Sequence, residues 1–148
     1  MTSTPSRDTA TRKKDVLAFL EKQGHYWLTT AEIGGRPHMI AVSGLWNGDE
    51  MVVTTLGTSK TARNMAMNPL VVLAGGDPAD AIVIQAQMLD SVPVEDSPRM
   101  VQEWKAAMGW EPAGDWVFYR LRPTRIQAFR GYEEITGRDV MIRSRWVE

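Results

Sequence analysis

The sequence is short of the side chains that most often carry chemistry in enzymes. Its 148 residues include no cysteine and only two histidines, His25 and His38. The absence of cysteine excludes disulfides, thiolate-bound zinc, iron–sulfur clusters and a cysteine nucleophile. No zinc-type histidine spacing is present, and a histidine site would need carboxylates to complete it, so we expect no metal centre. Reaction chemistry must therefore have another source.

Long apolar runs and an excess of one charge are also missing. Lys and Arg number 17 against 18 Asp and Glu, which gives a formal net charge of −1. A dedicated nucleic-acid-binding protein normally has a basic excess, so we expect no nucleic-acid partner. The longest apolar runs have four or five residues, too few to span a membrane, and no secretory segment is visible. We therefore expect a cytoplasmic protein without membrane contact.

The motifs of several enzyme classes are absent too. The sequence contains no G-x-G-x-x-G dinucleotide fingerprint, no Walker phosphate loop and no G-x-S-x-G nucleophile elbow. A mechanism built on one of these motifs is excluded.

Composition along the chain predicts one domain behind a short leader. Residues 1–14 are rich in Ser, Thr and charge, which is typical of a flexible N-terminal segment. From Asp15 the apolar spacing becomes helical, and Gly24 follows as a C-terminal stop. Residues 15–148 have the length of a single domain and contain no internal repeat.

Short apolar runs separated by turn residues predict a mainly β fold. Gly34-Gly35 and Asn47-Gly48 are hairpin signals, and Ser97-Pro98 is a typical helix start that Gly109 would close. The predicted strands are His25–Ile33, Arg36–Trp46, Glu50–Leu56, Leu70–Ala74, Ala81–Met88, Trp116–Leu121 and Thr124–Arg130, with a short extension at Val140–Trp146. We expect Pro123 to separate two of these strands and Leu70–Ala74 to be buried on both faces. This pattern favours a small antiparallel β-barrel with peripheral helices over a parallel sheet.

The segment from Gly57 to Asn64 is the most informative for function. Ser59 or Thr58 can cap a short helix that runs to about Met67, which places Lys60 and Arg63 in its first turn. Two cations are unfavourable at a helix N-terminus unless an anion lies between them and the free backbone N–H groups. The segment therefore predicts a phosphate site. The alternative is that both side chains extend into water or pair with a nearby Asp or Glu.

Three further features could contribute to such a site. Thr54 and Thr55 immediately precede the helix and could orient a bound ring or its phosphate tail, although threonine is also simply a good strand former. His38 could be a polar contact or a proton donor, or an ordinary structural residue. Near the C-terminus, Arg145 and Trp146 could pair with a phosphate and stack on a planar ring, or anchor the chain end to the barrel.

The order and spacing of several short motifs resemble a known family, the split β-barrel flavoproteins related to pyridoxamine 5′-phosphate oxidase. The first motifs are Tyr26-Trp27-Leu28-Thr29-Thr30, Gly35-Arg36-Pro37-His38, Trp46, Ser59-Lys60, Arg63-Asn64 and Asn68-Pro69. Three later motifs are similar to the flavin and deazaflavin oxidoreductase branch: Gly109-Trp110-Glu111-Pro112, Tyr119-Arg120-Leu121-Arg122-Pro123 and Ser144-Arg145-Trp146. The resemblance runs from about Asp15 to Trp146.

This resemblance implies an FMN-binding type of split barrel that forms a homodimer with cofactor sites at the interface. The cofactor would be FMN or the deazaflavin coenzyme F-420. The residues that the resemblance assigns to it are His38, Met39, Ile40, Ala41, Val42, Thr54, Thr55, Ser59, Lys60, Arg63, Asn64, Arg145 and Trp146. The backbone around Met39–Val42 would face the ring, and Ser59, Lys60 and Arg63 would hold the phosphate.

One departure from the family pattern bears on the substrate. The segment His38-Met39-Ile40-Ala41-Val42-Ser43 has no Lys or Arg, whereas the oxidase proper has basic residues there. We therefore expect hydride transfer between the cofactor and a small, fairly apolar organic molecule rather than oxidation of pyridoxamine phosphate. Two alternatives stay open: a non-catalytic flavin or tetrapyrrole carrier, and an interaction module whose cofactor site has decayed.

Overall fold

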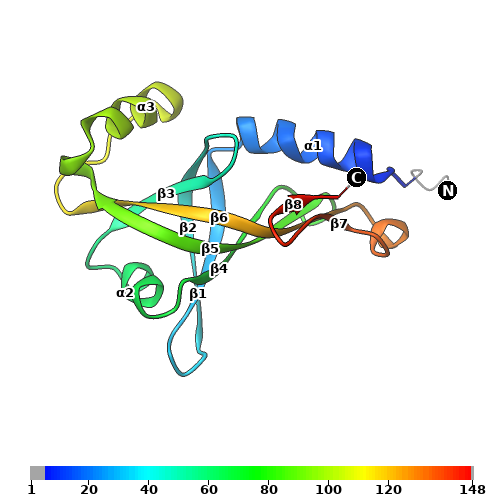
Figure 1. The fold of residues 1–148 in the computed structure, drawn as a ribbon, viewed down its shortest axis with the longest axis horizontal. Helices are drawn as coiled ribbons and strands as arrows, with labels where there is room; N and C mark the ends of the chain where they lie inside the picture. The colour runs from blue at the N-terminus through cyan, green and yellow to red at the C-terminus, as the bar shows by residue number, and fades with distance from the viewer. Residues whose placement is uncertain (1–5, 148) are drawn as a thin grey trace.

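The computed structural model describes residues 6–147, which form a closed six-stranded antiparallel barrel with two further strands and three helices (Figure 1). The barrel order is β3-β2-β1-β4-β5-β6, and β6 pairs again with β3 to close it. The strands are β1 (His25–Ala31), β2 (Pro37–Trp46), β3 (Met51–Leu56), β4 (Leu70–Gly75), β5 (Ala81–Pro93), β6 (Trp116–Phe129), β7 (Asp139–Ile142) and β8 (Arg145–Trp146). The helices are α1 (Thr9–Lys22), α2 (Lys60–Met67) and α3 (Pro98–Met108), with short 3-10 turns η1 (Val94–Asp96) and η2 (Tyr132–Glu134). The predicted mainly β split barrel is confirmed.

Alternate residues of the strands fill the barrel. Leu28, Leu73 and Ile84 face one another across β1, β4 and β5 and are fully buried. α1 packs against the barrel with Val16 and Leu20, which are also fully buried. The period-2 apolar pattern in the sequence therefore marks the inner face of the sheet.

The N-terminal segment differs from its prediction. α1 begins at Thr9, not at Asp15, because Asp8 caps it by accepting a hydrogen bond from the Thr11 N–H at 2.8 Å. The predicted start of the helix at Asp15 is therefore wrong, while residues 1–5 lie outside the described residues. The division into a leader and a single domain otherwise stays a prediction.

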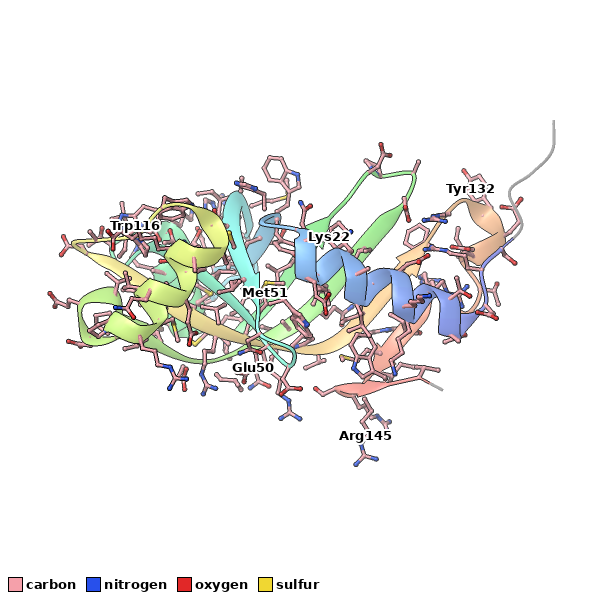
Figure 2. The ribbon with its side chains drawn as sticks, turned by 90° about the horizontal axis from the view of Figure 1, so that it is seen from above. Lys22, Glu50, Met51, Trp116, Tyr132 and Arg145 are labelled. Carbon is pink, nitrogen blue, oxygen red and sulfur yellow. The ribbon has the colours of Figure 1, made fainter. Side chains whose placement is uncertain are left out.

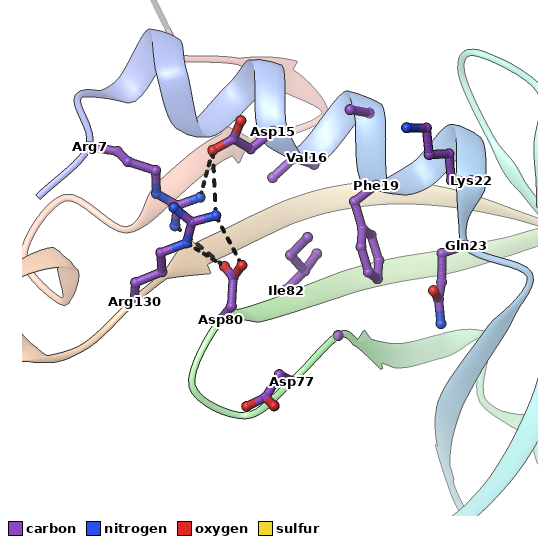
Figure 3. Close-up of a pocket in the computed structure, with 12 residues that line it drawn as sticks. Arg7, Asp15, Val16, Phe19, Lys22, Gln23, Asp77, Asp80, Ile82 and Arg130 are labelled. Carbon is purple, nitrogen blue, oxygen red and sulfur yellow. Dashed lines mark hydrogen bonds and ion pairs between the residues drawn. The ribbon is translucent and has the colours of Figure 1, made fainter. Parts of the chain in front are cut away.

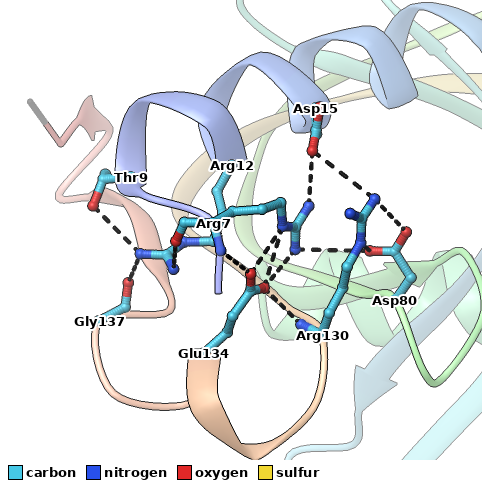
Figure 4. Close-up of polar contacts among 8 residues, drawn as sticks. All are labelled: Arg7, Thr9, Arg12, Asp15, Asp80, Arg130, Glu134 and Gly137. Atoms are coloured by element: carbon cyan, nitrogen blue, oxygen red, sulfur yellow. Dashed lines mark hydrogen bonds and ion pairs between the residues drawn. The ribbon is translucent and has the colours of Figure 1, made fainter. Parts of the chain in front are cut away.

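Side-chain contacts explain the early start of α1 (Figure 4). Arg12 is buried and donates to the Arg7 carbonyl at 2.8 Å and to the carbonyl of Gly137. Arg7 in turn pairs with Glu134 in η2. Gly137 and Glu134 lie more than 120 positions from their partners in the sequence, so local composition could not predict these contacts.

β6 is one continuous strand, and the predicted break at Pro123 is wrong. Residues 116–121 of β6 pair with β3, whereas residues 125–127 pair with β7. Pro123 lies between the segment that pairs with β3 and the segment that pairs with β7. Along this edge of β6 its missing N–H therefore removes no hydrogen bond between strands. On the other edge, Gln85 and Ala86 of β5 pair with Arg125 and Pro123, so the register shifts there and Thr124 is an extra residue in β6. β5 itself runs on to Pro93, past the predicted end at Met88.

Candidate functional site

One edge of β2 has no partner strand along residues 37–43, and we call it the open edge of β2. β2 pairs with β1 from Pro37 to Ser43, but it pairs with β3 only from Gly44 to Trp46. In an antiparallel strand, about half of the backbone N–H and C=O groups point toward each neighbour. The groups of residues 37–43 that point away from β1 therefore have no sheet partner. This edge includes every residue from His38 to Val42 that the resemblance assigns to a cofactor.

α2 packs against β1 and β3 and begins as predicted. Ser59 is its N-cap, and the Ser59 hydroxyl accepts a hydrogen bond from the Ala62 N–H at 3.1 Å. Among the described residues, the backbone N–H groups of Lys60 and Thr61 have no acceptor. The first turn of α2 contains no acidic residue. It therefore presents two free N–H groups and the positive end of the helix dipole.

Hydroxyl and amide groups connect α2 to the strands. Asn64 is buried and donates from Nδ2 to the Thr30 hydroxyl on β1 at 3.1 Å. The Thr55 and Ser59 hydroxyl oxygens are 3.5 Å apart. Thr54, by contrast, donates to the Val117 carbonyl on β6 at 2.9 Å, so its hydroxyl is already satisfied within the barrel. Thr30 pairs with His38 across β1 and β2, which brings the half-buried His38 to the same end of the barrel.

The two cations of α2 both have partners within the chain. Lys60 Nζ is 2.6 Å from Glu32 Oε1, and Arg63 donates from Nη1 to the Thr58 carbonyl at 2.7 Å. The alternative of pairing with a nearby acid therefore describes Lys60 in this structure. The side chains of Lys60 and Glu32 are 41% and 38% exposed, so the pair lies at the surface. Surface pairs of this kind are weak and easily exchanged.

Glu32 is an acidic residue that lies among three basic side chains. Its pKa lies below the usual range, first because it accepts a hydrogen bond from Lys60 and then because of the charge of Lys60. The charges of Arg36 and His38 lower this pKa further. Glu32 belongs to the β1–β2 hairpin, where its N–H donates to the Arg36 carbonyl at 3.0 Å. One carboxylate thus faces three basic side chains beside the start of α2.

The outward face of β1, β2 and β4 is apolar and exposed. Trp27, Met39 and Leu70 are 53%, 61% and 63% exposed. Trp27 lies opposite Ala41 and Ala74, so these side chains share one face of the sheet. The prediction that β4 is buried on both faces is wrong, because only Val71 and Leu73 on its inner face are buried.

Within one chain, Arg145 and Trp146 lie apart from α2. Trp146 lines a hollow of about 290 Å³ together with Trp46, Asp49 and Glu50 at the start of β3, whereas α2 follows the end of β3. A six-residue strand separates the two places by about 17 Å. Lys13 lies 5.4 Å from the centre of the Trp146 ring, and Figure 2 shows Arg145 projecting away from the molecule.

Another hollow, of about 380 Å³, lies between α1 and the β4–β5 turn (Figure 3). Its charged residues are bonded to one another: Asp80 pairs with Arg130 at 3.0 Å, and Asp15 pairs with Arg7 at 3.0 Å. Phe19 forms part of its apolar wall. We interpret this hollow as part of the packing that holds α1, because four of its charged residues, Arg7, Asp15, Asp80 and Arg130, pair with one another.

Sequence reasoning missed two residues of the site. Glu32 was overlooked because it lies in a turn far from Lys60 in the sequence, and Thr30 because a threonine in a strand carries no special signal. Within residues 6–147, no cluster of three or more His, Asp or Glu could hold a metal ion, and no helix is long and apolar enough to cross a membrane.

The fold matches several solved structures. An F-420 reductase superposes with a TM-score of 0.64 and 23% identity over 74% of this chain and 93% of that chain. A Listeria innocua protein described provisionally as a pyridoxamine 5′-phosphate oxidase superposes with a TM-score of 0.65 and 18% identity, over 80% of this chain and 98% of that chain. The heme storage protein HutZ from Vibrio cholerae superposes with a TM-score of 0.61 and 15% identity, over 90% of this chain and 99% of that chain.

These matches show that the chain has the split β-barrel fold of the pyridoxamine 5′-phosphate oxidase-like proteins. The resemblance found in the sequence is thereby confirmed at the level of the fold. No model of a protein family matches the sequence, and no curated protein matches it.

Proposed function

We propose that this protein is a cytoplasmic oxidoreductase that binds FMN or the deazaflavin coenzyme F-420 beside the open edge of β2. It would transfer a hydride between the cofactor and a small, fairly apolar organic substrate. The observation that carries this proposal is the juxtaposition of two features at the β1–β2 hairpin: the unpaired edge of β2, and the cationic start of α2, which the Lys60–Glu32 pair joins to that hairpin.

The donor set at α2 fits a phosphate group. Two backbone N–H groups, the Ser59 hydroxyl and the side chains of Lys60 and Arg63 are donors, and no carboxylate lies in the first turn. Thr61 adds a further argument, because its buried hydroxyl has no hydrogen-bond partner although it lies in this same turn. Buried polar groups are nearly always satisfied, so an orphaned hydroxyl favours a bound polar ligand or water.

The edge of β2 fits a planar ring with polar atoms on its rim. Backbone N–H and C=O groups of residues 37–43 can bond such a rim, while the exposed Ile40 offers apolar contact. A bound flavin or deazaflavin supplies the redox chemistry, whereas the protein supplies orientation and electrostatics. The lack of Lys and Arg from His38 to Trp46 leaves no second phosphate site on this strand. An apolar substrate suits this lining.

We further propose that a second copy of the chain covers the outward face of β1, β2 and β4. This face carries Trp27, Met39 and Leu70 in exposed positions, and the adjoining outward positions hold Ala41, Val72 and Ala74 rather than charged residues. A contiguous apolar patch of this kind is typical of a protein interface. Arg145 and Trp146 would take part in cofactor binding only from the partner chain, because they lie away from α2 in their own chain.

Fluorescence titration with FMN and with F-420 tests the cofactor proposal. We expect saturable binding of at least one of them, and at least tenfold weaker binding in the double variant Lys60→Ala/Arg63→Ala, because charge-assisted contacts to phosphate are strong. The matched control is Arg99→Ala/Lys105→Ala, which removes two exposed cations from α3. Unchanged affinity in the first double variant would show that α2 does not hold the phosphate.

The same titration distinguishes the alternatives. The fold match to HutZ favours a tetrapyrrole carrier as the second candidate function, so hemin is titrated in parallel. Oxidation of the reduced, bound cofactor by substrate at a steady rate would support an enzyme over a carrier. A protein that binds none of the three compounds would be an interaction module.

A further inference from the structure

We propose that Glu32 sets the charge that the phosphate site accepts, and that it favours a singly charged phosphodiester over a doubly charged phosphomonoester. This inference rests on the proposed cofactor site at α2. It assigns a specificity-determining role to a residue of the β1–β2 hairpin that no motif marks.

The position of Glu32 carries the argument. Its carboxylate Oε1 is 2.6 Å from Lys60 Nζ, at the start of the helix whose free N–H groups would meet an anion. Its N–H bonds to the Arg36 carbonyl, and Gly35 donates to the Glu32 carbonyl at 2.8 Å, so the tight turn fixes its backbone. The carboxylate therefore occupies the cationic end of the site whenever no other anion does.

An incoming phosphate meets this carboxylate in two ways. It must take Lys60 away from Glu32, and it then lies close to the negative charge of the Glu32 carboxylate. Repulsion between charges at a fixed distance is proportional to the charge of the ligand. A phosphomonoester with charge near −2 therefore suffers twice the repulsive free energy of a phosphodiester with charge −1.

The remaining charges show why Glu32 decides the balance. Lys60 and Glu32 cancel each other, while Arg63 and Arg36 leave the site with a moderate positive charge. Such a site can hold one negative charge well. Replacing Glu32 by Gln removes one negative charge and keeps a side chain of nearly the same shape. The gain in affinity should therefore grow with the charge of the ligand.

Three ligands that share one ring test this relation: riboflavin, its 5′-(methyl phosphate) diester, and FMN, with charges of 0, −1 and about −2. Binding is measured by flavin fluorescence at pH 8, where the monoester is fully ionised. In Glu32→Gln we expect no change for riboflavin, about threefold tighter binding of the diester and about tenfold tighter binding of FMN. The gain for FMN is thus about the square of the gain for the diester.

The control is Glu133→Gln, an exposed residue in η2 whose change alters net charge equally but far from α2. Equal gains for all three ligands, no gain, or weaker binding in Glu32→Gln would overturn the role of Glu32. The proposed cofactor site would still stand if Lys60→Ala/Arg63→Ala weakens binding of FMN. Absence of binding by both wild type and Glu32→Gln would overturn the proposed function and this inference together.

Discussion

The side chain of Glu134, which is 1% exposed, accepts hydrogen bonds from both the backbone N–H and the guanidinium of Arg7. The distances are 2.6 Å from Arg7 N to Oε2 and 2.7 Å from Arg7 Nη2 to Oε1. The pair connects the residues before α1 to the turn between β6 and β7, 127 positions later. It therefore fixes the N-terminal segment against the far end of the barrel.

Arg7→Met should destabilise the protein strongly. It leaves the Glu134 carboxylate buried without its main partner, which typically lowers the free energy of unfolding by about 3–5 kcal/mol. The double variant Arg7→Met/Glu134→Met should be more stable than Arg7→Met, because no buried charge remains. Urea unfolding measures both. Arg99→Met, which breaks an exposed pair with Glu103, is the control and should change stability by less than about 0.5 kcal/mol. A similarly small effect of Arg7→Met would contradict the structure.

The same pair predicts acid sensitivity. The hydrogen bond from Arg7, together with backbone N–H bonds from Arg7 and Arg130, lowers the pKa of Glu134 from 4.5 to about 2. Because the folded-state pKa is below that of the unfolded chain, the stabilisation is complete above about pH 4.5 and is lost as the pH falls toward 2. The loss amounts to about 3 kcal/mol. Urea unfolding of wild type and Glu134→Gln between pH 6 and pH 2.5 should show a stability difference that shrinks with acid. A constant difference would count against this pKa.

Gly44 should tolerate no side chain. A Cβ atom there would lie 2.9 Å from Met51 Sδ and 3.0 Å from Tyr26 Cδ2, and both side chains are buried. Gly44→Ala should therefore lower the free energy of unfolding by about 1–3 kcal/mol. Gly34→Ala is the matched control, since a Cβ at Gly34 meets nothing within 4 Å, and its effect should stay within about 0.5 kcal/mol. Equal stability of the two variants, measured by thermal unfolding, would show that the core is looser than described.

Charge on the outward sheet face should dissociate the proposed dimer. Leu70→Glu places a carboxylate on the apolar face, so we expect the dimer dissociation constant to rise at least tenfold. Sedimentation velocity over a range of concentrations measures this constant. Tyr132→Glu changes an aromatic residue that is 90% exposed on η2 and should leave the constant unaltered. A wild-type protein that stays monomeric at every concentration would reject the dimer.

Local patterns predicted the parts of the fold that depend on neighbours in sequence. Hairpin glycines, the Ser59 cap and the left-handed Gly109 at the end of α3 lie where the sequence indicated. The start of α1 and the continuity of β6 were predicted wrongly. Both depend on partners that are distant in sequence. The segment before α1 is held by Glu134, and β6 pairs with β3 along its first half and with β7 along its second half.

The same distinction applies to the candidate site. Ser59, Lys60, Arg63 and Asn64 share one helix start, and helical spacing alone brings them together. The pairing of Lys60 with Glu32 depends on a hairpin that folds back beside α2, so the sequence revealed the cations but not their partner. Which residues a second chain contributes depends on a surface match that no spacing within one chain encodes.

Closure of the barrel has a consequence for the order of folding. The ladder that closes it joins Met51 to Leu121, so a long loop must be ordered before β3 gains its second neighbour. Folds dominated by such distant pairings form slowly compared with helical ones. During synthesis on the ribosome, residues 37–67, which contain β2, β3 and α2, emerge well before the strand that fixes β3 in place. The part of the proposed cofactor site that lies on β2 and α2 is therefore encoded in the first half of the chain but acquires its shape only when β6 has been made.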